Sequence, residues 1–198
     1  KTGVGDLLVQ AKPVSKDGRT GGLTVADSGA GGQRLGFATA TLSSQGDIVF
    51  RGQGKTTAQG DLVLNAPRVT AAYDPIADVN ANQKVVATGD LTVSRSEGGR
   101  SLNESLGAGG QLSLEGRTLK QQGNIDIESG RLNLLARGDQ GAPAQALVFA
   151  AGSNTSVAGR LRQVSDTYAV ASGGGQITAQ ATQGAIVVDG TLSAAAPT

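Results

Sequence analysis

A five-residue unit recurs along this chain: Gly, a polar or small residue, an aliphatic residue, any residue, and a second aliphatic residue. Each unit predicts a short strand opened by a turn, because alternation of aliphatic residues with a period of two is typical of a strand. No segment carries a convincing helical stripe; the nearest, 101–106, is short and bounded by Gly-Gly. The units lie at 5–9, 46–50, 60–64, 89–93, 110–114, 123–127, 130–134, 175–179 and 184–188.

The spacing of the units predicts stacked coils and excludes a simple hairpin meander. Leu112 and Leu132 are 20 residues apart with another unit between them, which matches one coil of about three short strands. Leu62 and Leu91 are 29 residues apart, which indicates a coil with an extruded loop. Because each coil returns to the same side, its strands pair in parallel with those of the next coil. We therefore expect an all-β fold, a parallel β-helix, in which residues 1–198 form a single solenoid of stacked short-strand coils.

Composition agrees with a narrow core. The chain has 31 Gly, only 3% aromatic residues, and no Met, Cys, Trp or His. Leu, Ile, Val and Ala must then fill the interior, and a stack of narrow layers needs only a few such side chains per layer. We expect Phe37, Phe50 and Phe149 to stack inside the coils.

Three segments interrupt the repeat and are predicted to be loops that leave the coils: 12–20, 73–82 and 137–143. Contacts with partner molecules are expected to concentrate in the second and third, since binding residues gather on loops held by a rigid scaffold. Strands near the two ends, with Leu7 and Val9 at one and 186–192 at the other, are expected to meet adjoining coils of the same polypeptide.

Charge excludes two classes of partner. The chain has 17 Lys and Arg against 16 Asp and Glu, with the two signs mixed along it. Nucleic acid and anionic membrane surfaces both call for clustered cations, so neither is expected. The densest basic segment, 160–162, is interpreted as an exposed strand edge. No run of about 18 apolar residues is present to span a bilayer.

The chain begins at Lys1, without an initiator Met or a signal segment, and we expect it to be a fragment of a larger protein. The absence of Cys fits a protein that crosses an oxidising periplasm unfolded, and it equally fits many cytosolic proteins.

The glycine-opened units of 110–138, and the tail from 173 to 192, resemble the filamentous haemagglutinin family, the secreted exoproteins of two-partner secretion systems. This resemblance implies a right-handed β-helical shaft on the bacterial cell surface, exported through an outer-membrane transporter partner. It also implies a role in adhesion, biofilm formation or contact-dependent competition. Its ligand would be an unidentified surface receptor or polysaccharide. The Asn-rich signatures of the family's secretion domain are absent, so the chain is expected to come from the shaft or a distal region.

The tripeptide Arg137-Gly138-Asp139 is the one short motif that indicates receptor binding, because integrins bind this sequence on exposed loops. It is followed by a Gly-Ala-Pro segment and not by an aliphatic strand, which places it on a turn. A plain solvated turn is the favoured alternative. Tyr73, beside Asp74-Pro75, is a second candidate for partner contact at a loop tip.

Catalytic, cofactor-binding and metal-ligating residues are not expected. Asp47, Asp61 and Asp90 share one repeat position and could line an edge of the fold as acids do in pectin-degrading enzymes, but residues after a corner Gly usually cap the turn and face water. The Gly-Gly pairs lack the Asp that calcium-binding nonapeptide repeats require, and zinc ligands of the His and Cys type are absent.

Three function classes remain open. The first is the structural shaft or binding segment of a secreted filamentous adhesin, which we favour. The second is the stalk of a contact-dependent growth-inhibition exoprotein, which a distal toxin domain would distinguish. The third is a β-helical polysaccharide-processing enzyme, which an assay for sugar-chain cleavage would distinguish.

Overall fold

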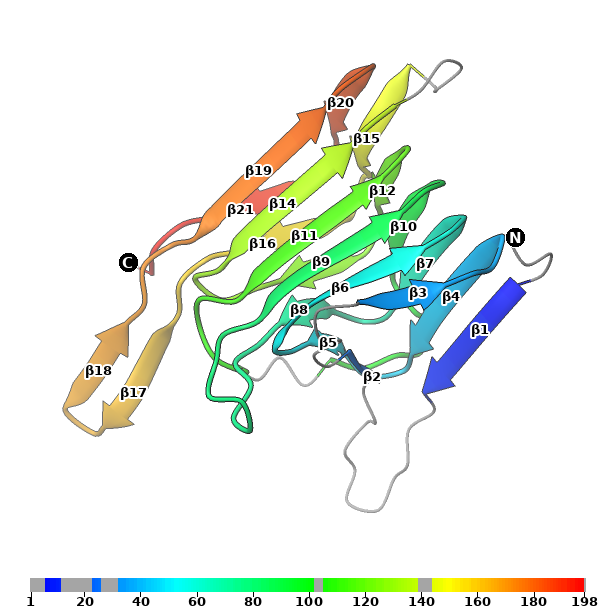
Figure 1. Cartoon of the computed structure of the whole chain (residues 1–198). Coiled ribbons are helices and arrows are strands. Elements are labelled where there is room, and N and C mark those ends of the chain that lie inside the picture. The colour runs from blue at the N-terminus through cyan, green and yellow to red at the C-terminus, as the bar shows by residue number, and fades with distance from the viewer. Residues whose placement is uncertain (1–5, 12–22, 26–31, 102–104, 139–143, 198) are drawn as a thin grey trace.

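The computed structural model describes residues 6–11, 23–25, 32–101, 105–138 and 144–197 (Figure 1). These residues form strands and turns and contain no helix, so the prediction of an all-β fold is confirmed for this part of the chain. A helix able to cross a membrane is accordingly not found in it. Three parallel sheets, here named A, B and C, and one antiparallel hairpin account for the strands.

Sheet A has seven strands in an order that follows the chain. They are β1 (Asp6–Ala11), β4 (Thr39–Ser44), β7 (Asp61–Asn65), β10 (Leu91–Ser94), β12 (Leu119–Gln121), β15 (Gln145–Phe149) and β20 (Ala185–Val188). Sheet B has six strands, again in chain order. They are β2 (Leu23–Val25), β5 (Ile48–Phe50), β8 (Val69–Ala71), β13 (Asn124–Asp126), β16 (Asn154–Ser156) and β21 (Thr191–Ser193).

Sheet C also has six strands. They are β3 (Gln33–Leu35), β6 (Gln53–Ala58), β9 (Asn82–Ala87), β11 (Gln111–Gly116), β14 (Arg131–Ala136) and β19 (Gln176–Ala181). The hairpin consists of β17 (Leu161–Ser165) and β18 (Tyr168–Ala171), inserted between β16 and β19.

The chain visits the sheets in a fixed rotation from A to B to C and back to A. One step departs from it: β10 of sheet A is followed by β11 of sheet C, and β8 pairs directly with β13 through the single bridge between Val69 and Ile125. Because each return reaches the same sheet, every pairing in sheets A, B and C is parallel. The strands therefore lie stacked side by side in Figure 1.

The spacing deduced from the sequence agrees with the observed register. Leu112 pairs with Leu132 across β11 and β14, and Leu62 pairs with Leu91 across β7 and β10. One return of the chain thus takes 20 residues where the connections are short. Longer returns contain the connections 72–81, 95–110 and 157–175, which all lead into sheet C.

The core consists of columns of aliphatic side chains that continue from strand to strand. In sheet A, Leu62, Leu91, Leu119 and Leu147 occupy one register position and are fully buried. The next member of this column, Ile186 of β20, is 41% exposed because no described strand lies beyond it. Burial of each such Leu side chain contributes about 2 kcal/mol to folding.

The aromatic residues divide between core and surface. Phe50 and Phe149 are buried in the core, as predicted. The same prediction is wrong for Phe37, which is only half-buried because it lies in the turn between β3 and β4 and not in a strand. Tyr168, on the hairpin, is 60% exposed.

The predicted loops fall as follows. Residues 72–81 connect β8 to β9 and contain one antiparallel bridge between Asp74 and Val79. The segment 12–20 lies outside the described residues. Of the segment 137–143, only Arg137 and Gly138 are described.

Contacts with adjoining coils are predicted for residues near both ends of the chain. At the far end Val188 and Leu192 are 51% and 41% exposed, while Val9 is partly buried against the core. The side chain of Leu7 lies outside the described set.

Candidate functional site on the outer side of sheet B

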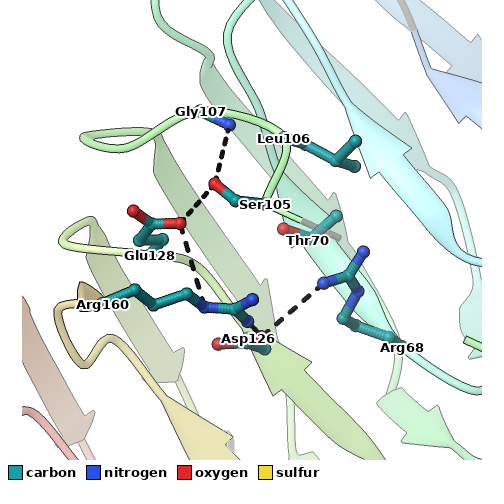
Figure 2. A pocket seen from close by; sticks show the side chains of 8 residues that line it. All are labelled: Arg68, Thr70, Ser105, Leu106, Gly107, Asp126, Glu128 and Arg160. Atoms are coloured by element: carbon teal, nitrogen blue, oxygen red, sulfur yellow. Dashed lines mark hydrogen bonds and ion pairs between the residues drawn. The ribbon is translucent and has the colours of Figure 1, made fainter. Parts of the chain in front are cut away.

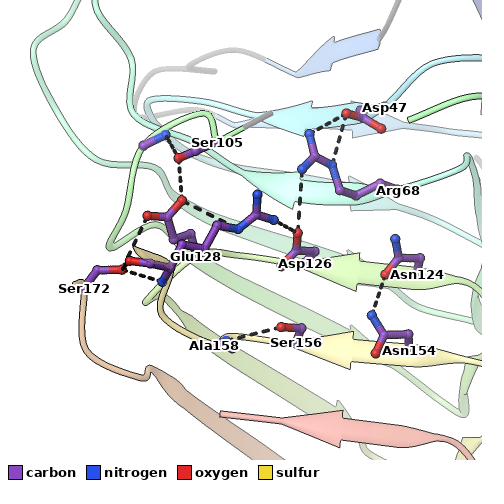
Figure 3. Close-up of polar contacts among 12 residues, drawn as sticks. Asp47, Arg68, Ser105, Asn124, Asp126, Glu128, Asn154, Ser156, Ala158 and Ser172 are labelled. Atoms are coloured by element: carbon purple, nitrogen blue, oxygen red, sulfur yellow. Dashed lines mark hydrogen bonds and ion pairs between the residues drawn. The ribbon is translucent and has the colours of Figure 1, made fainter. Parts of the chain in front are cut away.

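Six charged residues of alternating sign run across the outer side of sheet B. Figure 3 labels Asp47, Arg68, Asp126 and Glu128 of this set, and Figure 2 also labels Arg160. They come from distant parts of the sequence and meet because the stacked strands bring their corners together. We call this set the ion chain. In order of contact it consists of Asp47, Arg68, Asp126, Arg160, Glu128 and Arg162.

The inner half of the ion chain is centred on Arg68, which directly precedes β8 and is 2% exposed. Its guanidinium donates to Asp47 Oδ2 from Nη2 at 2.6 Å and from Nε at 3.1 Å. A third nitrogen, Nη1, lies 3.6 Å from Asp126 Oδ2 on β13. A buried guanidinium needs such partners, since an unpaired charge in the interior is destabilising by several kcal/mol.

The outer half is centred on Glu128, whose side chain is 3% exposed in the turn after β13. Its Oε1 accepts hydrogen bonds from Arg162 Nη2 at 3.0 Å and Nε at 3.2 Å, and its Oε2 lies 3.8 Å from Arg160 Nε. Ser105 Oγ also donates to Glu128, and Arg160 contacts Asp126. Three separate segments of the chain thus meet at one carboxylate.

The structure corrects one prediction about the repeated Asp positions. Asp61 begins β7 and Asp90 directly precedes β10, and Asp61 Oδ1 accepts the Asp90 N–H at 2.8 Å. Asp47 instead precedes β5 of sheet B, and its side chain is 9% exposed. The prediction that these residues share one edge and face water is therefore wrong for Asp47, because Arg68 covers it.

The ion chain encloses almost no free space. The cavity lined by Arg68, Asp126, Glu128, Arg160 and Ser105 has a volume of about 10 Å³, the size of one water molecule. General acid and base catalysis needs two titratable groups that face a substrate in a cleft. Here the carboxylates face guanidinium groups instead, so the arrangement suits the anchoring of segments to the sheet.

The candidate receptor motif begins at Arg137, which directly follows β14. Its Nη1 donates to Glu115 Oε1 at 3.0 Å and its Nη2 donates to the Ala87 carbonyl oxygen at 2.6 Å. The guanidinium that a receptor would have to capture is thus engaged within the sheet. Gly138 has a φ of +67°, a left-handed conformation that favours Gly, and Asp139 lies outside the described residues.

Tyr73, the other candidate contact residue, is half-buried at the base of the connection between β8 and β9. Its hydroxyl donates to Asp78, and its carbonyl oxygen accepts from Arg51. The hydrogen bond to Asp78 raises the pKa of the Tyr73 hydroxyl, with burial and the charges of Asp78 and Asp74 adding to the effect. The exposed apolar side chain of this loop is that of Ile76, which is 96% exposed, and not that of Tyr73.

The outer side of sheet C carries a hollow of about 240 Å³, lined by both polar and apolar residues that include Lys84, Ser113, Leu135 and Thr178. Glu115 lies in it, between Lys84 Nζ at 2.9 Å and Arg137 Nη1 at 3.0 Å. Burial by itself would raise the pKa of Glu115, but the hydrogen bonds and charges of Lys84 and Arg137 outweigh it and hold the pKa below its usual range. Within the described residues, no three acidic side chains gather as a metal site.

Sequence reasoning missed the ion chain. Arg160 and Arg162 were interpreted as an exposed strand edge, and Arg68, Asp126 and Glu128 were not singled out. The partners lie 21 to 58 residues apart in sequence, so no local motif connects them. The repeat gave a signal for Asp126, which lies in the predicted unit 123–127, but none for Arg68, which lies in no predicted unit.

Comparison with known proteins does not extend this description. No protein-family model matches the chain, and searches of curated proteins and of solved structures find no match either. Inferences about function therefore rest on the chain's own geometry.

Proposed function

We propose that this chain is a right-handed parallel β-helix and serves as a structural shaft segment of a secreted bacterial filamentous adhesin. The observation that carries the proposal is the rotation of successive strands through sheets A, B and C with parallel register, as between Leu112 and Leu132. Such a stack can be extended by further coils at either end, which is the property a shaft needs. The location would be the bacterial cell surface, after export through an outer-membrane transporter.

The hand of the helix follows from a general rule. Crossovers that join parallel strands of one sheet are right-handed in nearly all proteins, because of the twist of the strands. Each return from sheet A to sheet A here is such a crossover.

A structural role is also supported by the bonding partners of the polar groups. The carboxylates of the ion chain are paired with guanidinium groups, and the cavity between them has room for about one water molecule. The hollow on sheet C is partly open to solvent, which suits surface contact with a receptor or polysaccharide better than chemistry on a sequestered substrate. We accordingly propose a role in binding and support and not in catalysis.

The β-helix is tested by adding a coil. A tandem copy of residues 111–130 inserted after Gly130 should fold with unchanged or higher stability, and should lengthen the molecule by about 4.8 Å. The matched control is a copy of residues 111–120 only, which would return the chain half-way round and should disrupt folding. Equal disruption by both insertions would contradict the β-helix.

The adhesin role is tested with beads coated with the purified chain. They should attach to cultured epithelial cells or to bacterial biofilm more than beads coated with serum albumin. No excess attachment to either surface would contradict the proposal. Release of reducing ends from pectin or other polysaccharides would favour the enzyme instead.

A further inference from the structure

The hairpin β17–β18 exposes four large apolar side chains. Leu161, Val164, Tyr168 and Val170 are 61%, 64%, 60% and 44% exposed. The hairpin projects away from the stacked sheets (Figure 1) and contains only two strands. A two-stranded hairpin is marginally stable in water, and a hydrophobic face on three or more strands is needed for stability.

The two edges of the hairpin differ. The strand β17 carries Arg162 and has a register irregularity between Gln163 and Ser165, and both features hinder pairing with another strand. The strand β18, with the sequence Tyr-Ala-Val-Ala, has no charge, no Pro and no irregularity of its own. Its edge is therefore the one open to strand addition.

The backbone groups at this edge can be assigned. Ser172 N–H donates to the Arg160 carbonyl oxygen at 3.0 Å, so the backbone of Ser172 faces β17. Alternation along an antiparallel strand turns Val170 toward β17 as well, and turns the N–H and C=O groups of Ala169 and Ala171 outward. These outward groups have no strand beside them within the described part of the chain.

The hairpin is held firmly at its root. Arg162 binds the buried carboxylate of Glu128 at 3.0 Å, and Arg160 N–H donates to Ser172 Oγ at 2.8 Å across the base of the hairpin. A rigid root presents the β18 edge in one orientation, which lowers the entropic cost of pairing.

We propose that β18 pairs antiparallel with β18 of a second copy of this chain, forming a four-stranded sheet across a two-fold axis at Val170. Ala169 of each copy then lies opposite Ala171 of the other, which satisfies the outward backbone groups of both. The two Val170 side chains form a pair that is not hydrogen-bonded, in which the Cα atoms approach to about 4.5 Å.

Charge and geometry favour a second copy as the occupant. A two-fold contact places identical strands against each other, so any charge in the strand would face its own kind, and β18 has none. The exposed Tyr168 and Val170 of both copies come together on one face, and four strands supply the minimum that two strands lack. The proposal stands whether or not the chain is an adhesin.

The test uses the absence of Cys from this chain. A single Val170→Cys substitution should give a disulfide-linked dimer on mild oxidation, because two Cys residues in a non-hydrogen-bonded pair satisfy disulfide geometry. The matched control is Val164→Cys, at a Val on β17 that is more exposed than Val170. In the proposed sheet the two positions 164 are separated by three strand spacings, about 14 Å, and should not cross-link.

A second measurement follows dimerisation without cross-linking. In sedimentation equilibrium the wild type should show a concentration-dependent dimer, Val170→Lys should abolish it, and Val164→Lys should retain it, since a Lys pair at the two-fold axis brings like charges together. Hydrogen exchange over 161–171 shows that the hairpin survives each substitution. A wild type that stays monomeric up to its solubility limit, equal cross-linking of both Cys variants, or a dimer that persists in Val170→Lys would overturn the proposal.

Discussion

Gln121 of β12 and Thr155 of β16 are joined by a hydrogen bond of 3.1 Å inside the core, where both side chains are fully buried. The amide of Gln121 also donates to the Asn154 carbonyl oxygen at 3.1 Å and accepts the Gly123 N–H at 3.3 Å. Gln121 occupies a register position that Val93 fills on the preceding strand. The bond links sheet A to sheet B across the corner between them.

Replacing Gln121 with Leu should lower the free energy of unfolding by about 1–3 kcal/mol, because Thr155 Oγ and Gly123 N–H lose buried partners. Chemical denaturation followed by circular dichroism measures the change. The control is Lys120→Leu on the same strand, which is exposed and should change stability by less than about 0.5 kcal/mol. A Gln121→Leu variant as stable as the control would contradict the role of the bond.

Replacing Arg68 with Met should destabilise the chain by about 3–5 kcal/mol, because the buried Asp47 carboxylate then lacks a counter-charge. Adding Asp47→Leu should recover most of the loss, since the uncompensated charge is removed. The two single variants and the double variant are compared by denaturant unfolding. If the double variant loses as much unfolding free energy as the two single variants together, Arg68 and Asp47 are not coupled.

Replacing Glu128 with Gln should loosen the hairpin while leaving the sheets intact, because Arg160 and Arg162 lose the carboxylate that holds them. Hydrogen exchange should speed up over 161–171 and stay unchanged over 111–116. The control is Asp166→Asn at the exposed tip of the hairpin, where no change is expected. Faster exchange throughout the chain would indicate a general loss of stability instead of a local anchor.

Replacing Glu115 with Gln should lower stability by about 1 kcal/mol at neutral pH, because the carboxylate pairs with Lys84 and Arg137. The pKa of Glu115 is lower in the folded chain than in the unfolded one. Its contribution is therefore complete above the unfolded pKa of about 4.3 and is lost as pH falls through the folded value.

The measurement is thermal or denaturant unfolding of the wild type and Glu115→Gln from pH 7 to pH 3. The difference between them should shrink as pH falls below about 4. Glu97→Gln, at an exposed position, serves as the control and should show no such trend. A stability difference that grows on acidification would contradict the predicted pH dependence.

Nine of the 21 strands in the described part of the chain, and the sequence interval between stacked strands, could be predicted from the sequence. Alternation in units such as 110–114 and 130–134 is local information, and the 20-residue interval between them equals one return of the chain. Of the candidate contact residues, Arg137 and Tyr73 were found to bond within the protein, to Glu115 and Asp78. Sequence alone does not reveal such partners, because neither lies at a fixed local spacing.

By itself, then, the sequence determined that this protein is built from short strands with a narrow aliphatic core, because strand alternation and Gly-opened turns depend on neighbouring residues. The tertiary structure decided which sheet each unit joins. Asp47 and Asp61 hold the same repeat position, yet one lies beside sheet B under Arg68 and the other begins a strand of sheet A. The physical reason is that connection lengths and contacts between distant residues, such as Arg162 with Glu128, set the place of each strand, and these depend on the whole stack.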